Sequence, residues 1–223
     1  MFRKWKESTD ETYATRNRSV IIELDKYLNL DIEPLHEEFV RVIDTISKKY
    51  WNQFYSNASK FGNFEEDPTD VKTLYLTELI PGVDMDTDYF LIDKDNYWVD
   101  LPIYDKFPKI KKMVSELPFD HTGRIMMVFS KNGTEIVTHF DHDYKDWRQE
   151  MIWIGLSAKK LFILDNNQPI YLQGSSCWFD SQKSHGTKSN GYSISMRIDG
   201  KFNSDFRDKL FGKDSKWQTR ENP

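Results

Sequence analysis

Apolar residues in the first half of the chain recur at helical spacing in two segments. In "EPLHEEFVRVIDTISKKYW" they stand three or four residues apart, and Pro34 suits the first turn of a helix. The apolar positions are Leu35, Phe39, Val42, Ile43, Ile46 and Tyr50. We therefore predict one helix from Pro34 to about Tyr55 and a second, within "YDKFPKIKKMVSELP", from about Asp105 to Glu116.

From Gly123 onward the pattern changes to short runs rich in β-branched and aromatic residues, separated by turn signals such as "KNG", "DNN", "QGSS" and "SNGY". The runs are "RIMMVFS", "EIVTHFD", "EMIWIGL", "KKLFILD", "QPIYLQ", "SSCWFD", "SHGTKS" and "YSISMRID". About eight short strands at this spacing are typical of a β-sandwich or barrel. We predict a mainly β fold with flanking helices, a double-stranded β-helix (jelly roll, cupin-like), in which the early helices cover the outer face of one sheet.

The predicted elements form one structural domain with three parts. Residues 1–118 are expected to be a helical and irregular flank that packs on the barrel, residues 119–202 the jelly-roll catalytic core, and residues 203–223 a polar C-terminal tail. The acidic and aromatic segment 65–105 leaves two interpretations open, a lid or an irregular flank.

Composition narrows the class of protein. The formal net charge of −5 gives no bulk attraction to nucleic acid or to an anionic membrane, so we expect neither as a partner. No apolar run approaches membrane-spanning length, and the first residues contain no apolar targeting segment. The single cysteine, Cys177, excludes an internal disulfide and suits a reducing compartment. We therefore expect a cytoplasmic protein, and the sequence leaves its oligomeric state open.

The pattern His-x-acid occurs twice, from His36 to Glu38 and from His139 to Asp141. In the predicted helix, residues two apart point away from each other, so His36 and Glu38 cannot bind one ion together and His36 is expected to be solvated. In the predicted strand "EIVTHFD", residues two apart project from the same face. His139 and Asp141 can therefore converge on one metal ion, provided that the extended conformation continues to Asp141.

A third metal ligand would come from a distant strand, because a jelly roll brings strand ends far apart in the sequence to one mouth. The segment "SQKSHGTKS" supplies His185. Two imidazoles and one carboxylate form the metal site of non-haem Fe(II) oxygenases. The alternative for His185 alone is a histidine in a surface loop.

The last run, "YSISMRID", places an arginine among small hydroxyl side chains. On a strand, Ser193, Ser195 and Arg197 share one face, and the other face is apolar. The apolar face can pack on a helix while Arg197 points into the barrel. A buried arginine requires an anionic partner, and its planar fork matches a carboxylate in bidentate fashion. That partner is either a bound ligand or one of the 36 acidic residues of the chain.

The order His139-x-Asp141, then His185, then Arg197, resembles the metal triad and the cosubstrate-anchoring arginine of 2-oxoglutarate- and Fe(II)-dependent oxygenases. This resemblance implies a dioxygenase that uses Fe(II), 2-oxoglutarate and O2 to hydroxylate a C–H bond. Arg197 would bind the distal carboxylate of 2-oxoglutarate, with Ser195 beside it in the cosubstrate site.

Residues 98–202 are similar more narrowly to the aspartyl/asparaginyl β-hydroxylase family. The shared layout includes a Gly-Arg that opens a strand, the first histidine, an arginine shortly after it at Arg148, and an aromatic strand before the last histidine. The similarity implies that Arg148 contacts the carboxylate beside the keto group and that the substrate is an amino acid, free or within a peptide or protein. Two departures are Asp141, which some members of that family lack, and Met151, which stands where a second cosubstrate-contacting histidine is expected.

Two other functions stay open at this point. One is a cupin-like isomerase or hydrolase that uses Zn or Mn in the same fold, since a fold does not determine a function. Such an enzyme would not need Arg197 to face the metal. The other is a non-catalytic binding module, with segment 65–105 as the surface for its partner.

Overall fold

The computed structural model describes residues 21–46, 51–52, 71–82, 97–130, 135–139, 150–157, 160–164, 168–181, 185–189 and 191–212. Most of the described strands belong to two antiparallel sheets. The large sheet has the order β1 (Ile21–Glu23), β11 (Ser176–Phe179), β8 (Met151–Gly155), β13 (Ser193–Phe202), β6 (Phe119–Ser130), β3 (Val71–Tyr75) and β2 (Trp51–Asn52). The small sheet has the order β10 (Gln168–Tyr171), β9 (Lys160–Leu164), β12 (His185–Ser189) and β7 (Glu135–His139).

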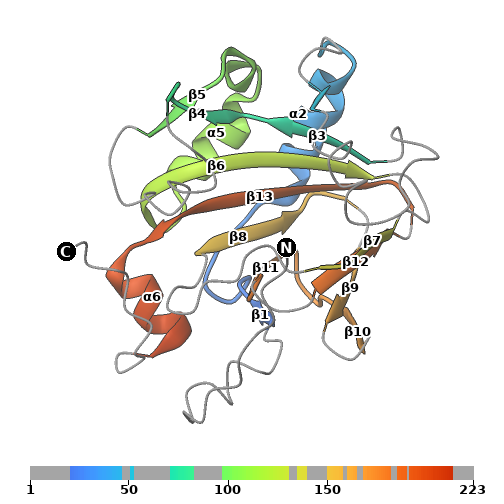
Figure 1. Ribbon diagram of the computed structural model, residues 1–223, viewed down its shortest axis with the longest axis vertical. Helices are drawn as coiled ribbons and strands as arrows, with labels where there is room; N and C mark the ends of the chain where they lie inside the picture. Colours follow the sequence, from blue (N-terminus) through green and yellow to red (C-terminus); the bar gives the residue numbers. More distant parts are fainter. Residues whose placement is uncertain are drawn as a thin grey trace.

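The chain crosses repeatedly between these two sheets after residue 119. β6, β8, β11 and β13 belong to the large sheet, and the strands that lie between them in the sequence belong to the small one. This alternation is the topology of a double-stranded β-helix, so the predicted jelly roll is confirmed. All eight predicted runs are strands, and β6 and β13 extend beyond the predicted runs, to Phe119 and to Phe202. In Figure 1, β6 and β13 cross the middle of the view and the small sheet lies at its lower right.

The two faces of β13 differ as the sequence predicts. Ile194, Met196 and Ile198 are at most 6% exposed and belong to the same core cluster as the apolar stripe of helix α2 (Ile32–Ile43). The opposite face is turned toward the small sheet. Arg197 on this face stands directly opposite Trp153 of β8, and the Trp153 ring contacts Phe162 of the small sheet edge to face, with centroids 5.0 Å apart. We call this face of the large sheet the inner face.

Helix α2 is shorter than predicted, because it ends at Ile43 and not near Tyr55. The hydroxyl of Thr45 donates to the carbonyl of Val42 at 2.7 Å, and a tight turn follows. Further on, Trp51 and Asn52 form β2 and pair with β3. At Trp51 and Asn52, backbone pairing with β3 thus replaces the predicted helix. Leu35, Phe39, Val42 and Ile46 of the predicted stripe are buried, and Tyr50 lies outside the described residues.

The second predicted helix is divided in two. A 3-10 helix, η3 (Pro102–Lys106), is followed by α5 (Pro108–Ser115), in which proline occupies the first position because it has no N–H to donate. The N-terminus of α5 receives a buried carboxylate from α2. Glu38, 1% exposed, accepts hydrogen bonds from the backbone N–H groups of Lys109 and Ile110, both at 2.9 Å. Helices α2 and α5 are joined by this contact.

Two parts of the chain outside the predicted core belong to the structured fold. In the predicted flank, β4 (Thr77–Leu79) pairs with β5 (Trp98–Asp100), while β1, β2 and β3 extend the large sheet. Within the expected polar tail after residue 202, Ser204–Phe211 forms helix α6. Phe206 of α6 is buried against Phe202, with ring centroids 5.0 Å apart. This aromatic contact fixes the helix to the end of β13, at the lower left of Figure 1.

Candidate metal and cosubstrate site

Two of the predicted metal ligands occupy opposed positions on neighbouring strands. His139, the last residue of β7, is the register partner of His185, the first residue of β12. Directly opposed residues of an antiparallel pair belong to the same face of a sheet, with Cβ atoms about 4.5–5.5 Å apart. The two positions, 46 residues apart in the sequence, are therefore neighbours in the fold.

His185 lies in an aromatic environment between the sheets. Its side chain is buried, and its ring is 5.0 Å from that of Phe179 on β11. Phe162 of β9 is 5.6 Å from Phe179, which continues the aromatic wall toward Trp153. The surface-loop alternative for His185 is excluded, because the residue starts a strand and is 5% exposed.

Several members of the predicted site lie outside the described residues. These are Asp141, Arg148 and the side chain of His139. Within the described part of the chain, no three His, Cys, Asp or Glu side chains are grouped so that they could hold a metal ion. The triad of His139, Asp141 and His185 therefore stays a prediction.

Arg197 belongs to a buried cluster of charged groups on the inner face. Its Nε donates to Oδ1 of Asp199 at 2.9 Å, and Nε of Arg124 on β6 donates to Oδ2 of the same carboxylate at 2.7 Å. Asp199 is fully buried, and both arginine side chains are about a tenth exposed. One carboxylate thus orients two guanidinium groups, one on each oxygen.

Tyr75 of β3 completes this cluster. Burial raises the pKa of its hydroxyl, while the positive charge of Arg124 and a hydrogen bond with it act in the opposite direction. Ser195, the other predicted cosubstrate contact, is fully buried two residues before Arg197 on the same face. Sequence reasoning missed Arg124 and Asp199 as neighbours of Arg197. The alternation along "YSISMRID" already places residue 199 on the face of residue 197, but the partner on β6 depends on the pairing of distant strands.

The remaining candidates of the sequence form no metal-binding group among the described residues. His36 is half-buried on α2, and Glu38 is engaged at the N-terminus of α5, so the two do not form a metal site. Met151 is fully buried and is the register partner of Asp199. Cys177 is fully buried, and burial raises the pKa of its thiol well above the usual value.

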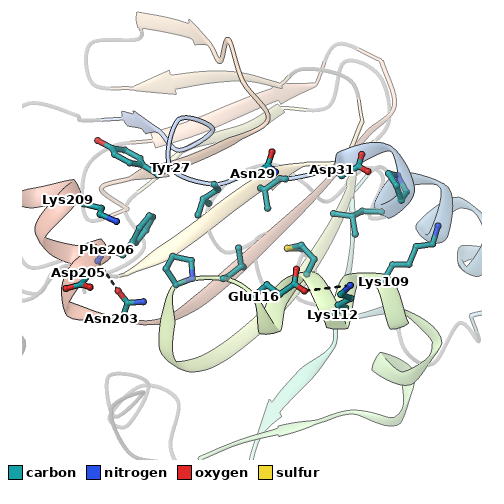
Figure 2. A pocket seen from close by; sticks show the side chains of 17 residues that line it. Tyr27, Asn29, Asp31, Lys109, Lys112, Glu116, Asn203, Asp205, Phe206 and Lys209 are labelled. Atoms are coloured by element: carbon teal, nitrogen blue, oxygen red, sulfur yellow. Dashed lines mark hydrogen bonds and ion pairs between the residues drawn. The ribbon is translucent and has the colours of Figure 1, made fainter.

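A groove of about 690 Å³ lies on the outer side of the fold, between the segment that precedes α2, α5 and the start of α6. Figure 2 shows that charges of both signs line it, with Lys109, Lys112 and Lys209 alongside Asp31 and other acids. Lys112 forms an ion pair with Glu116 at 3.8 Å. The groove contains none of the predicted site residues, and its mixed charge selects no particular ligand.

Within the described residues, no helix is long and apolar enough to cross a membrane. No protein-family model matches the sequence, and no curated protein sequence matches it either.

Comparison with solved structures gives matches of low similarity to cupin, dioxygenase and lyase structures. An RmlC-like cupin protein from Desulfovibrio desulfuricans is 18% identical, with a TM-score of 0.30 over 34% of this chain and 70% of that chain. A salicylate 1,2-dioxygenase from Pseudoaminobacter salicylatoxidans is 11% identical, with a TM-score of 0.28 over 43% of this chain, and the match spans only 23% of the dioxygenase. A DMSP lyase structure is 10% identical, with a TM-score of 0.37 over 77% and 73% of the two chains. All three TM-scores are below 0.5, and it is the strand order of this chain itself that establishes the double-stranded β-helix.

Proposed function

We propose that the protein is an Fe(II)- and 2-oxoglutarate-dependent dioxygenase that hydroxylates a C–H bond, with an amino acid, free or within a peptide or protein, as the expected substrate. His139, Asp141 and His185 would hold the metal, and Arg197 the distal carboxylate of 2-oxoglutarate. The observation that carries the proposal is the register of the small sheet, in which His139 and His185 are directly opposed. The resemblance of residues 98–202 to the aspartyl/asparaginyl β-hydroxylases agrees with it.

The donor set fits a non-haem iron site. Two imidazoles from neighbouring strands and one carboxylate two residues after the first histidine leave open positions for a chelating ligand. When bound, Fe(II) with 2-oxoglutarate would supply the activation of O2 and the oxidation of the C–H bond, with succinate and CO2 as coproducts. The protein contributes the geometry of the ligands and the environment of the reaction.

The side chains around the site have three separate tasks in this proposal. Arg197 would grip a carboxylate in bidentate fashion, since a guanidinium presents paired donors in one plane. Asp199 would hold that guanidinium in place through the bond to Nε. The rings of Phe162 and Phe179 would keep water away from the face of His185 and restrain side reactions.

The proposal is tested first by metal binding. Anaerobic protein is expected to bind one Fe(II) or Mn(II) per chain, and a His139→Ala, His185→Ala double variant is expected to lose that binding. His36→Ala is the matched control, because this histidine lies on α2 and should leave the metal affinity unchanged. Undiminished metal binding by the double variant would exclude the proposed ligands.

A second candidate function is a cupin-like Zn or Mn isomerase or hydrolase. The observation that favours it is the bond between Arg197 and Asp199, because an arginine that serves only to pair with an acid would not be needed for a cosubstrate. Under this alternative, 2-oxoglutarate would not affect the activity. We rank it second because the order of His139, Asp141, His185 and Arg197 fits the oxygenase pattern as a whole.

A further inference from the structure

Two buried arginines share one carboxylate on the inner face. Oδ1 of Asp199 accepts a hydrogen bond from Nε of Arg197 at 2.9 Å, and Oδ2 accepts one from Nε of Arg124 at 2.7 Å. Asp199 is fully buried, and the side chains of Arg197 and Arg124 are 11% and 9% exposed. Each arginine is therefore bonded to an acid whose other oxygen is held by the second arginine.

A β-bulge aims Arg124 at this carboxylate. The register between β13 and β6 shifts at Asp199, so that two residues of β6, Gly123 and Arg124, stand opposite this one residue of β13. Such a two-against-one arrangement re-aims the side chains of the bulged strand. The hydroxyl of Thr77 on β4 donates to the carbonyl of Gly123 at 3.0 Å and accepts from the N–H of Ile125 at 2.8 Å. Because these two groups flank Arg124 in the chain, its backbone is fixed on both sides.

Glu150 shows how a carboxylate in this protein meets one arginine with both of its oxygens. Oε1 of Glu150 accepts from Nε of Arg207, and Oε2 accepts from Nη2 of the same side chain at 3.0 Å. This two-pronged pairing is the stronger geometry for a guanidinium and a carboxylate. At Asp199, Arg124 holds Oδ2, so a bond through Oδ1 to Arg197 takes the place of the two-pronged mode.

The sharing also decides how much negative charge acts on Arg197. With both arginines in place, the charge of one carboxylate is divided between two cations. Without Arg124, the whole charge of Asp199 would act on Arg197, and one positive charge would be lost from a buried region in which electrostatic interactions are strong. Both effects weaken the attraction between Arg197 and an anionic ligand.

We infer that Arg124 is a positioning residue for cosubstrate binding, which acts through Asp199 to hold Arg197 in place without cancelling its charge. The inference rests on the proposed function, in which Arg197 binds the distal carboxylate of 2-oxoglutarate. The task of Arg124 is to occupy Oδ2 of Asp199, and contact with the cosubstrate is not required.

The test is a titration of 2-oxoglutarate into Fe(II)-loaded protein under nitrogen, followed by the absorption of the chelate. Arg124→Met keeps much of the volume of the side chain and removes both its charge and the bond to Oδ2. It is expected to weaken the binding of 2-oxoglutarate roughly tenfold to a hundredfold. Arg207→Met is the matched control, because it breaks the ion pair with Glu150 and is expected to leave the affinity unchanged. Other contacts of Arg197 are common to all these proteins and cancel in the comparison.

Two rescues separate positioning from structural damage. Arg124→Lys keeps a cation that reaches Oδ2 and is expected to bind 2-oxoglutarate within about threefold of the wild type. Adding Asp199→Asn to Arg124→Met removes the negative charge, and an amide has one acceptor oxygen and cannot hold Arg197 with two. This double variant is expected to bind 2-oxoglutarate at least about threefold more tightly than Arg124→Met alone. A role in folding alone predicts the opposite, because the double variant removes a further buried interaction.

A crystal structure of the ligand-free Arg124→Met protein gives a measurement that does not depend on 2-oxoglutarate. Both oxygens of Asp199 are expected to bond Arg197, in the geometry that Glu150 has with Arg207. An unchanged single bond between Asp199 and Arg197 in that structure would overturn the inference.

The titration can overturn the inference in three distinguishable ways. Wild-type affinity in a folded, iron-loaded Arg124→Met protein would remove the role of Arg124 and leave that of Arg197 intact. A double variant that binds more weakly than Arg124→Met would reduce Arg124 to a part of the fold. Absence of a chelate band in the wild type would refute the proposed function, and the inference would fall with it.

Discussion

Replacing Arg197 by alanine separates the role of this arginine in the fold from its proposed role in cosubstrate binding. The side chain is buried and bonded to Asp199, and Asp199 keeps a second partner in Arg124 when Arg197 is removed. A hydrogen bond to a charged group contributes about 1.5–3 kcal/mol, so Arg197→Ala should lose stability in roughly that range and still fold. Asp199→Ala should be more severe, about 3–5 kcal/mol, because it leaves two buried guanidinium groups without this carboxylate.

Arg197→Ala is also expected to weaken the binding of 2-oxoglutarate. Truncating one side of a desolvated, charge-assisted pair costs about 2–5 kcal/mol. At about 1.4 kcal/mol for each factor of ten, 2-oxoglutarate should bind roughly thirty-fold to several thousand-fold more weakly. Lysine at position 197 should restore only part of the affinity, since it keeps the charge but loses the two-pronged geometry.

The assay is a titration of 2-oxoglutarate into Fe(II)-loaded protein under nitrogen, with the metal-to-ligand charge-transfer absorption of the chelate as the signal. Arg207→Ala is a matched control, because Arg207, on α6, forms a partly buried ion pair with Glu150, which directly precedes β8. It should lose stability without a change in affinity. Equal affinity in a folded, iron-loaded Arg197→Ala protein would refute the role of this arginine. Absence of a chelate band in the wild type would refute the oxygenase proposal itself.

Two predictions concern stability alone. Glu38→Gln keeps the shape of the side chain but offers one acceptor oxygen to two backbone N–H groups. Chemical denaturation should therefore show that the free energy of unfolding falls by about 1–3 kcal/mol. The control Glu37→Gln, at an exposed neighbouring position, should lower it by less than about 0.5 kcal/mol. Asp25 accepts hydrogen bonds from the backbone and hydroxyls of Ser175 and Ser176, which outweigh the opposing effect of burial and lower its pKa. The pKa of Asp25 in the folded state therefore lies below its pKa in the unfolded state. Its contribution to stability is fully present at pH values above the unfolded-state pKa and is lost as the pH falls through the folded-state pKa. Melting temperatures of wild type and Asp25→Asn should differ at pH 7 and converge in acid, and a constant difference down to low pH would contradict this linkage.

The sequence by itself determined the strands of the core and the composition of their faces. Runs such as "EMIWIGL" and "YSISMRID" become strands because β-branched and aromatic side chains suit an extended backbone, and turn signals between them interrupt it. Side chains alternate between the two faces of a strand whatever its partner is. The separation of Arg197 from Met196 onto opposite faces of β13 could therefore be read from local pattern.

The sequence also limited the candidate site to a few residues, but it could not supply the distances between them. The opposition of His139 and His185 depends on the register of β7 and β12, which the chain between them does not encode locally. Likewise, Arg197 needed an anionic partner on physical grounds, and only the pairing of β13 with β6 brought Arg124 to the same carboxylate.

Only the tertiary structure decided which segments joined the sheets and where helix α2 ended. Every residue type except proline offers the same backbone hydrogen-bonding groups at a sheet edge. No local sequence pattern therefore predicts that Ile21–Glu23 or Trp51–Asn52 pairs there. The helical spacing of apolar residues extends to Tyr50, yet Trp51 and Asn52 pair with β3 instead of continuing a helix. The same holds for helix α6, which lies in a polar segment of the sequence. The ring of Phe206 packs against Phe202 at the end of β13, and this surface exists only in the folded barrel.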